Sequence, residues 1–194
     1  HALGLLAAEW RKRFTGTVVA VTGTAGKTTV KELIASILAT RGAVGRNYKN
    51  WNNELGVPQS MLGFTGREDV WVLEAGVSNP GDMEVLGRML RPDLAVITNV
   101  GAAHLEGLID LDGVAREKMR LAWFVQPGGK VVASADYPQL DLGHDLSSRL
   151  EVVLFSLCGR QARYHCREGA SAAGRVHGYV LDLDGRECHV HSEL

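Results

Sequence analysis

The sequence predicts an α/β fold in which a mostly parallel sheet is flanked by helices. Four short apolar runs, at residues 18–21, 70–73, 94–97 and 130–133, hardly alternate with polar residues, as expected for strands buried on both faces. Helical patterns separate these runs, which favours parallel strands joined by crossovers. A glycine-rich stretch directly after the first run predicts a P-loop at the end of the first strand.

The glycine-rich stretch supplies the predicted nucleotide-binding residues, which are Thr22, Gly23, Thr24, Ala25, Gly26, Lys27, Thr28 and Thr29. Gly23 and Gly26 allow the backbone to aim successive N–H groups at an anion on a helix N-terminus. Lys27 is expected to hold the β- and γ-phosphates of ATP, and the Thr28 hydroxyl to bind magnesium. The strict P-loop pattern has a glycine where this chain has Val21, but the strand before the loop and the helix after it favour the assignment.

Three helices are expected between the strands. The first follows the P-loop and is predicted to face the sheet through positions spaced at helical intervals, which are Val30, Leu33, Ile34, Ile37 and Leu38. The second is opened by Pro80-Gly81-Asp82 and stopped by Arg91-Pro92, and the third runs over residues 111–125 before Pro127-Gly128-Gly129.

Beyond about Asp136 the sequence changes to short β-rich runs, at residues 152–155, 162–166, 176–182 and 188–191. We expect a β-rich C-terminal tail of antiparallel strands at the edge of the same domain. Cys188, His189 and His191 resemble metal ligands, but strand alternation places Cys188 on the opposite face from the two histidines. A metal site in the tail is therefore not expected.

Composition excludes several classes of partner. The net charge of the 194 residues is −1, which gives no electrostatic reason to expect nucleic acid or an anionic membrane. The sequence has no apolar run of membrane-spanning length and no export leader. Its three cysteines lack metal-like spacing and are odd in number, so a reducing, cytoplasmic setting is expected.

Further polar residues follow the other predicted strands, where functional side chains collect in sheets of this type. Glu74 ends the strand over residues 70–73, and a carboxylate facing a P-loop suits magnesium. His104 lies in the small-residue loop after the strand over residues 94–97, and Lys118 lies on the helix that follows. Taken alone, His104 reads as an ordinary polar residue and Lys118 as a solvated lysine.

The order and spacing of these residues resemble the central ATPase domain of the Mur ligases, and within them the branch that adds D-alanyl-D-alanine. The matching stretches are TGTAGKTTVK at 22–31, NNELGVP at 52–58, EAGVSNPG at 74–81, RPDLAVITNVGAAHLE at 91–106 and GVAREK at 113–118. The resemblance extends over roughly residues 15 to 140. The assignment to the D-alanyl-D-alanine-adding branch depends mostly on NNELGVP and on Ala103-His104.

The resemblance implies a role for each matching residue. Lys27 would hold the phosphates, Thr28 and Glu74 would bind one magnesium ion, and His104 would help to bind a second. Lys118 would be carbamylated by carbon dioxide, which turns a cation into a carboxylate-like group able to bind or orient that second metal. Asn53 would lie near the γ-phosphate and the acceptor carboxylate.

The implied reaction is phosphoryl transfer from ATP to the carboxylate of a UDP-muramoyl tripeptide, followed by attack of the D-alanyl-D-alanine amine on the acyl phosphate. Residues 1–14 would form a linker helix from a missing N-terminal domain, and residues 15–194 a C-terminally incomplete central domain. Both substrates would be bound through missing flanking domains. The chain alone is therefore expected to be inactive, and the protein to be a monomer.

Two alternatives stay open. The same fold could serve another Mur-type ligase or a folylpolyglutamate-type ligase, because substrate choice would depend on sequence outside this window. A non-catalytic nucleotide-binding module is the other possibility. The combination of Glu74, His104 and Lys118 disfavours it, since nucleotide binding alone needs no second metal site.

Overall fold

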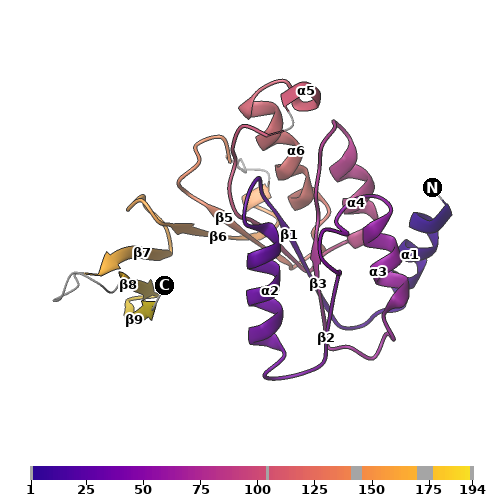
Figure 1. Ribbon diagram of the computed structural model, residues 1–194, viewed down its shortest axis with the longest axis horizontal. Helices are drawn as coiled ribbons and strands as arrows, with labels where there is room; N and C mark the ends of the chain where they lie inside the picture. The colour runs from indigo at the N-terminus through magenta and orange to yellow at the C-terminus, as the bar shows by residue number, and fades with distance from the viewer. Residues whose placement is uncertain (1, 104, 141–145, 170–176, 193–194) are drawn as a thin grey trace.

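The computed structural model describes residues 2–103, 105–140, 146–169 and 177–192, and it contains one nine-stranded sheet with helices on both faces (Figure 1). The strands are β1 (Thr17–Thr22), β2 (Val44–Arg46), β3 (Val70–Glu74), β4 (Leu94–Ile97), β5 (Lys130–Ser134), β6 (Glu151–Ser156), β7 (Tyr164–Gly169), β8 (His177–Leu183) and β9 (Arg186–Ser192). Their order in the sheet is β2-β3-β1-β4-β5-β6-β7-β8-β9. All neighbouring pairs from β2 to β7 are parallel, which confirms the predicted fold class.

The helices are α1 (Ala2–Arg13), α2 (Lys27–Leu38), α3 (Gly56–Gly63), α4 (Asp82–Leu90), α5 (Leu105–Leu108) and α6 (Leu111–Trp123). The predicted helices over 80–90 and 111–125 are confirmed as α4 and α6. Asp110 begins α6 by accepting a 2.7 Å hydrogen bond from the N–H of Gly113, as an N-cap residue does. Among the described residues, the structure has no helix long and apolar enough to cross a membrane.

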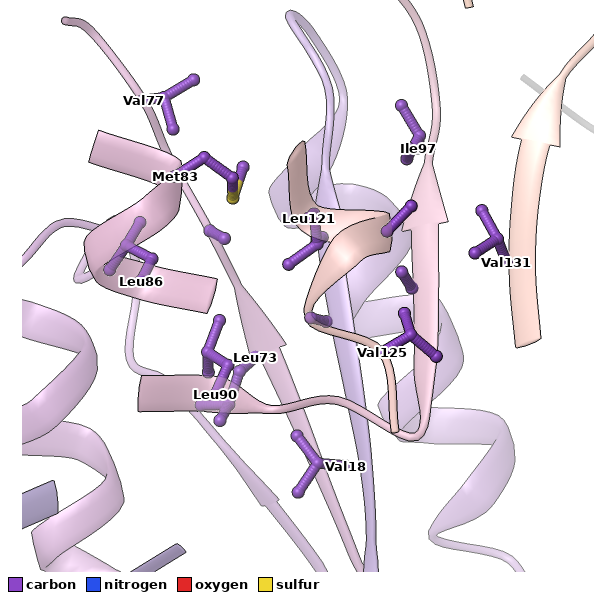
Figure 2. Close-up of a cluster of buried hydrophobic side chains, with 14 of the residues drawn as sticks. Val18, Leu73, Val77, Met83, Leu86, Leu90, Ile97, Leu121, Val125 and Val131 are labelled. Atoms are coloured by element: carbon purple, nitrogen blue, oxygen red, sulfur yellow. The ribbon is translucent and has the colours of Figure 1, made fainter. Parts of the chain in front are cut away.

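The central strands alternate between two hydrophobic cores. Val18 and Ala20 of β1 belong to the larger core, whereas Val19 and Val21 belong to the smaller one. Figure 2 shows the larger core, where strand residues meet side chains of α4 and α6; its labelled members are Val18, Leu73, Val77, Met83, Leu86, Leu90, Ile97, Leu121, Val125 and Val131. The smaller core lies under α2. Burial on both faces explains why these strands read as continuous apolar runs.

The face that α2 turns to the sheet differs from the predicted one. Val30, Ile34 and Leu38 do pack against the smaller core, but Leu33 and Ile37 are 58% and 67% exposed. The fully buried positions of α2 are instead an alanine and a lysine, Ala35 and Lys31. A hydropathy pattern assigns lysine to the exposed face of a helix. The buried face was therefore predicted to include Leu33 and Ile37 instead of Lys31.

The predicted antiparallel tail is half wrong. Strands β7, β8 and β9 are antiparallel to one another, and Figure 1 shows them at the end of the sheet away from α1. However, β6 runs parallel to β5, and β7 begins parallel to β6. A parallel connection must return to the edge of the sheet at which the strands begin, and the segment between Ser134 and Glu151 is long enough to do so.

Three short elements were not predicted, which are β2, α3 and the four-residue helix α5. β2 has only three residues, and α3 contains Gly56, Pro58 and Gly63, which are poor helix formers. The helix expected over residues 1–14 exists as α1 and packs against α3 and α4. Arg11 fixes it there by donating to the carbonyl of Leu90 at 2.9 Å and to Asp93 at 3.0 Å.

Candidate active site

The predicted phosphate loop connects β1 to α2. Thr22 is the last residue of β1 and Lys27 the first of α2. Gly26 has φ of 74° and Gly23 has φ of 156°, and a Cβ at Gly23 would collide with the Thr98 hydroxyl. No side chain caps the N-terminus of α2, so its first-turn N–H groups can serve an anion.

Asn99, at the end of β4, fixes the shape of this loop. Its Oδ1 accepts hydrogen bonds from the N–H groups of Thr24 and Ala25, both at 2.9 Å. Its Nδ2 donates to the carbonyl of Ala25, also at 2.9 Å. The N–H of Gly101 also donates to the Thr24 hydroxyl at 2.9 Å, which further connects the loop after β4 to the phosphate loop. Asn99 is not among the site residues predicted from the sequence, although it lies in one of the matching stretches.

Glu74 lies beside the phosphate loop with both carboxylate oxygens engaged. The Thr28 hydroxyl donates to Oε2 at 2.7 Å, and Nδ2 of Asn52 donates to Oε1 at 2.7 Å. The residue is only 1% exposed. A buried carboxylate beside a hydroxyl presents the hard oxygen donors that magnesium prefers, so Thr28 and Glu74 fit such an ion.

Of the two adjacent amides, Asn52 rather than Asn53 contacts Glu74. The Oδ1 atom of Asn53 accepts from the N–H groups of Leu55 and Gly56 at 3.2 and 2.9 Å, at the start of α3. Gly76 permits the close approach of Asn52, because a Cβ there would lie 2.7 Å from the amide carbon. The sequence places both asparagines next to each other, and only the fold separates their roles.

Lys118 lies in a poor environment for a cation. It is 3% exposed on α6. Burial is the main cause that lowers the pKa of Lys118, and the charge of Lys27 adds to it. Glu117 acts in the opposite direction, and together the three effects bring the pKa to about 8. Because the charge of Lys27 on α2 disfavours a charged Lys118 on α6, a bound anion or a modification of Lys118 to a negative group would relieve this repulsion.

Glu117 anchors the helix that carries Lys118. Its Oε1 accepts from the N–H groups of Gly81 and Met83, at 3.0 and 2.8 Å, at the start of α4. The carboxylate therefore ties α6 to the N-terminus of α4, where a negative charge is favourable. His104, the other predicted ligand of the second metal, lies outside the described residues.

Comparisons with known proteins identify the family to which the chain belongs. A family model described as the Mur ligase middle domain matches residues 21–194. The chain is 34% identical over 181 residues to the UDP-N-acetylmuramoyl-tripeptide--D-alanyl-D-alanine ligase of Synechocystis sp., a match that covers 93% of this chain and 37% of the relative.

Solved structures give the same result. MurF from Acinetobacter baumannii superposes with a TM-score of 0.89 at 25% identity, over 100% of this chain and 42% of that one. MurF ligase from Thermotoga maritima, solved in complex with ADP, has a TM-score of 0.86 at 29% identity, over 98% of this chain and 43% of that one. The chain thus spans less than half the length of these relatives. With its glycine-rich loop after β1 and the Glu74 carboxylate at the end of β3, it belongs to the Mur ligase middle domain family.

Proposed function

We propose that this chain is the ATP-binding middle domain of a ligase that joins D-alanyl-D-alanine to UDP-N-acetylmuramoyl-tripeptide. The observation that best supports this proposal is the 2.7 Å hydrogen bond between Thr28 and Glu74, which lies beside the uncapped N-terminus of α2. The helix N-terminus suits the phosphates of a nucleotide, and the two oxygen donors suit its metal ion. The names of the relatives supply the substrates, since those proteins are ligases of this type. In this proposal residues 1–14 are a linker and residues 15–194 belong to the central domain.

The first step would transfer the γ-phosphoryl group of ATP to the carboxylate of the tripeptide, releasing ADP. The loop N–H groups and Lys27 would bind the phosphates and neutralise charge that develops on the transferred group. Lys27 donates to the carbonyl of Thr24 at 3.1 Å, so its ammonium is already held over the loop. These residues would act by positioning and electrostatics.

Magnesium fits Thr28 and Glu74, and a second ion would be held by His104 and a carbamylated Lys118. Metal ions held by these residues would supply positive charge that neutralises the phosphate oxygens. A neutral amine is the form of lysine that reacts with carbon dioxide, and the burial that lowers the pKa of Lys118 to about 8 increases its share at neutral pH. Asn52 would hold Glu74 in place. The position of Asn53 near the γ-phosphate and the acceptor carboxylate stays a prediction from the resemblance.

In the second step the amine of D-alanyl-D-alanine would attack the acyl phosphate. The amide bond forms between the amine nitrogen and the carbonyl carbon, and the bond between that carbon and the phosphate oxygen breaks. Inorganic phosphate leaves, and the amine loses a proton to solvent. ATP as co-substrate and three free cysteines fit a cytoplasmic enzyme.

The test is phosphate release by the full-length protein with Mg-ATP and UDP-muramoyl tripeptide, with and without D-alanyl-D-alanine. Release that requires the dipeptide is the expected result. Release with a different amine, such as glutamate on a folate acceptor, would move the protein to another ligase type. No release with any pair, together with intact nucleotide binding, would favour the non-catalytic module.

A further inference from the structure

A buried lysine near the phosphate loop has no part in the reaction proposed above. Lys31 lies one turn into α2 and is fully buried, with 0% of its surface exposed. Its Nζ donates to the carbonyl of Asn47 at 2.6 Å and to that of Lys49 at 3.4 Å, and it lies 3.0 Å from Oε1 of Glu32. A buried ammonium is costly unless its donors are satisfied, so these three contacts explain why a lysine is stable there.

The loop that Lys31 holds carries a second buried polar residue. Asn47 is also 0% exposed. Its Oδ1 accepts from the N–H of Glu74 at 2.9 Å, and its Nδ2 donates to the carbonyl of Glu74 at 3.0 Å and to that of Trp51 at 2.8 Å. One amide thus holds both backbone polar groups of Glu74.

These contacts form a continuous chain from α2 to the end of β3. Lys31 fixes the backbone of Asn47, and the side chain of Asn47 fixes the backbone of Glu74. The Trp51 contact also holds the turn before Asn52, whose side chain contacts the Glu74 carboxylate. Both buried residues therefore act on where the carboxylate of Glu74 lies relative to Thr28.

We propose that Lys31 and Asn47 are positioning residues that fix Glu74 for the magnesium ion of the bound nucleotide. The inference rests on the proposed function, because it takes Glu74 as a metal ligand. Residues that orient a metal ligand contribute to metal affinity without touching the ion. A purely structural role would instead alter stability and leave the coupling between magnesium and nucleotide unchanged.

The experiment measures the affinity of the full-length protein for a non-hydrolysable ATP analogue, first with Mg²⁺ and then with EDTA. The ratio of the two affinities is the magnesium increment. Lys31→Met should lower this increment about tenfold, as loss of an orienting partner typically does, while the affinity in EDTA stays unchanged. Because EDTA affinity reports an intact phosphate loop, it also shows that the variant is folded.

Two further variants make the test specific. Lys49→Met makes the same chemical change at an exposed lysine of the same loop and should leave the increment unchanged. Asn47→Ala should lower the magnesium increment as Lys31→Met does. If Lys31→Met does not fold, Asn47→Ala tests the proposal in its place. The double variant should lose no more than either single variant, since residues in one network do not act additively.

Glu74→Gln distinguishes failure of this inference from failure of the proposed function. If Glu74→Gln loses the magnesium increment but Lys31→Met and Asn47→Ala keep it, the positioning role is wrong and the function stands. If wild type shows no increment, or Glu74→Gln retains it, Glu74 is not the metal ligand and the inference falls with that assignment. Loss of the increment in all three variants, with Lys49→Met unaffected, supports the proposal.

Discussion

The hydroxyl of Thr28 donates a 2.7 Å hydrogen bond to Oε2 of Glu74, joining the first turn of α2 to the carboxyl end of β3. The two residues are 46 positions apart in the sequence. They meet because β1 and β3 are parallel neighbours, with Val21 paired to Glu74 in register. Parallel strands bring their carboxyl ends to one edge of the sheet, and that edge is where we expect the chemistry.

The Thr28 hydroxyl can be removed with little change of shape by Thr28→Val. We expect ligase turnover of the full-length protein to fall about 100-fold, the scale on which loss of one catalytic polar contact acts. Thr28→Ser keeps the hydroxyl and should retain most activity. Equal turnover of the valine variant and wild type would remove Thr28 from the metal site.

Lys118→Ala should abolish turnover while largely sparing nucleotide binding, because the lysine is proposed to act after modification rather than as a phosphate ligand. Lys118→Arg keeps a positive charge but cannot form the carbamate, so it should be equally inactive. Phosphate release and nucleotide affinity are measured in parallel. Activity of the arginine variant at the wild-type level would show that the charge, not the modification, matters.

The two adjacent asparagines should respond differently. Asn52→Ala removes the 2.7 Å bond to Glu74 and should lower turnover about tenfold, the effect of a lost supporting contact. Asn53→Ala removes the bonds at the start of α3 and should lower the free energy of unfolding by about 1 kcal/mol. Turnover and denaturant unfolding of both variants separate these effects, and the reverse pattern would assign the catalytic contact to Asn53.

Asn99→Ala should weaken nucleotide binding about tenfold, equivalent to about 1.4 kcal/mol. The variant loses three hydrogen bonds that hold Thr24 and Ala25, so the loop must be ordered at the moment of binding. Asn50→Ala, at an exposed amide, serves as the matched control. Tighter binding in Asn99→Ala would mean that Asn99 competes with phosphate for the loop N–H groups.

Glu68 should make stability depend on pH in the acid range. Partial burial alone would raise the pKa of Glu68, but hydrogen bonds from backbone N–H groups, Trp71 and Thr65 lower it to about 2. A depressed carboxyl pKa stabilises the fold above its unfolded value of 4.5, and this contribution is lost as pH falls toward 2. Thermal unfolding of Glu68→Gln should therefore differ from wild type at pH 7 and converge with it near pH 2; an equal difference at both values would contradict the assignment.

The glycine-rich loop between β1 and α2 could be predicted from sequence because its signal is local. Gly23, Gly26, Lys27 and Thr28 are contiguous, and each has a residue type that its position requires. The strands β1, β3, β4 and β5 were predicted for a similar reason, since burial on both faces leaves an unbroken apolar run. The inward face of α2 was not, because Lys31 is buried through partners that no hydropathy pattern contains.

What the sequence by itself determined is the fold class, the phosphate loop and the carboxylate at Glu74, all of which depend on residue type and short spacing. The tertiary structure alone decided which asparagine contacts Glu74, that Asn99 holds the loop, and that Asn47 and Lys31 hold Glu74. These contacts join positions 16 to 75 residues apart. These contacts form because the order of the parallel strands brings separate loops together at the carboxyl edge of the sheet. Local sequence patterns do not reveal the order of the strands.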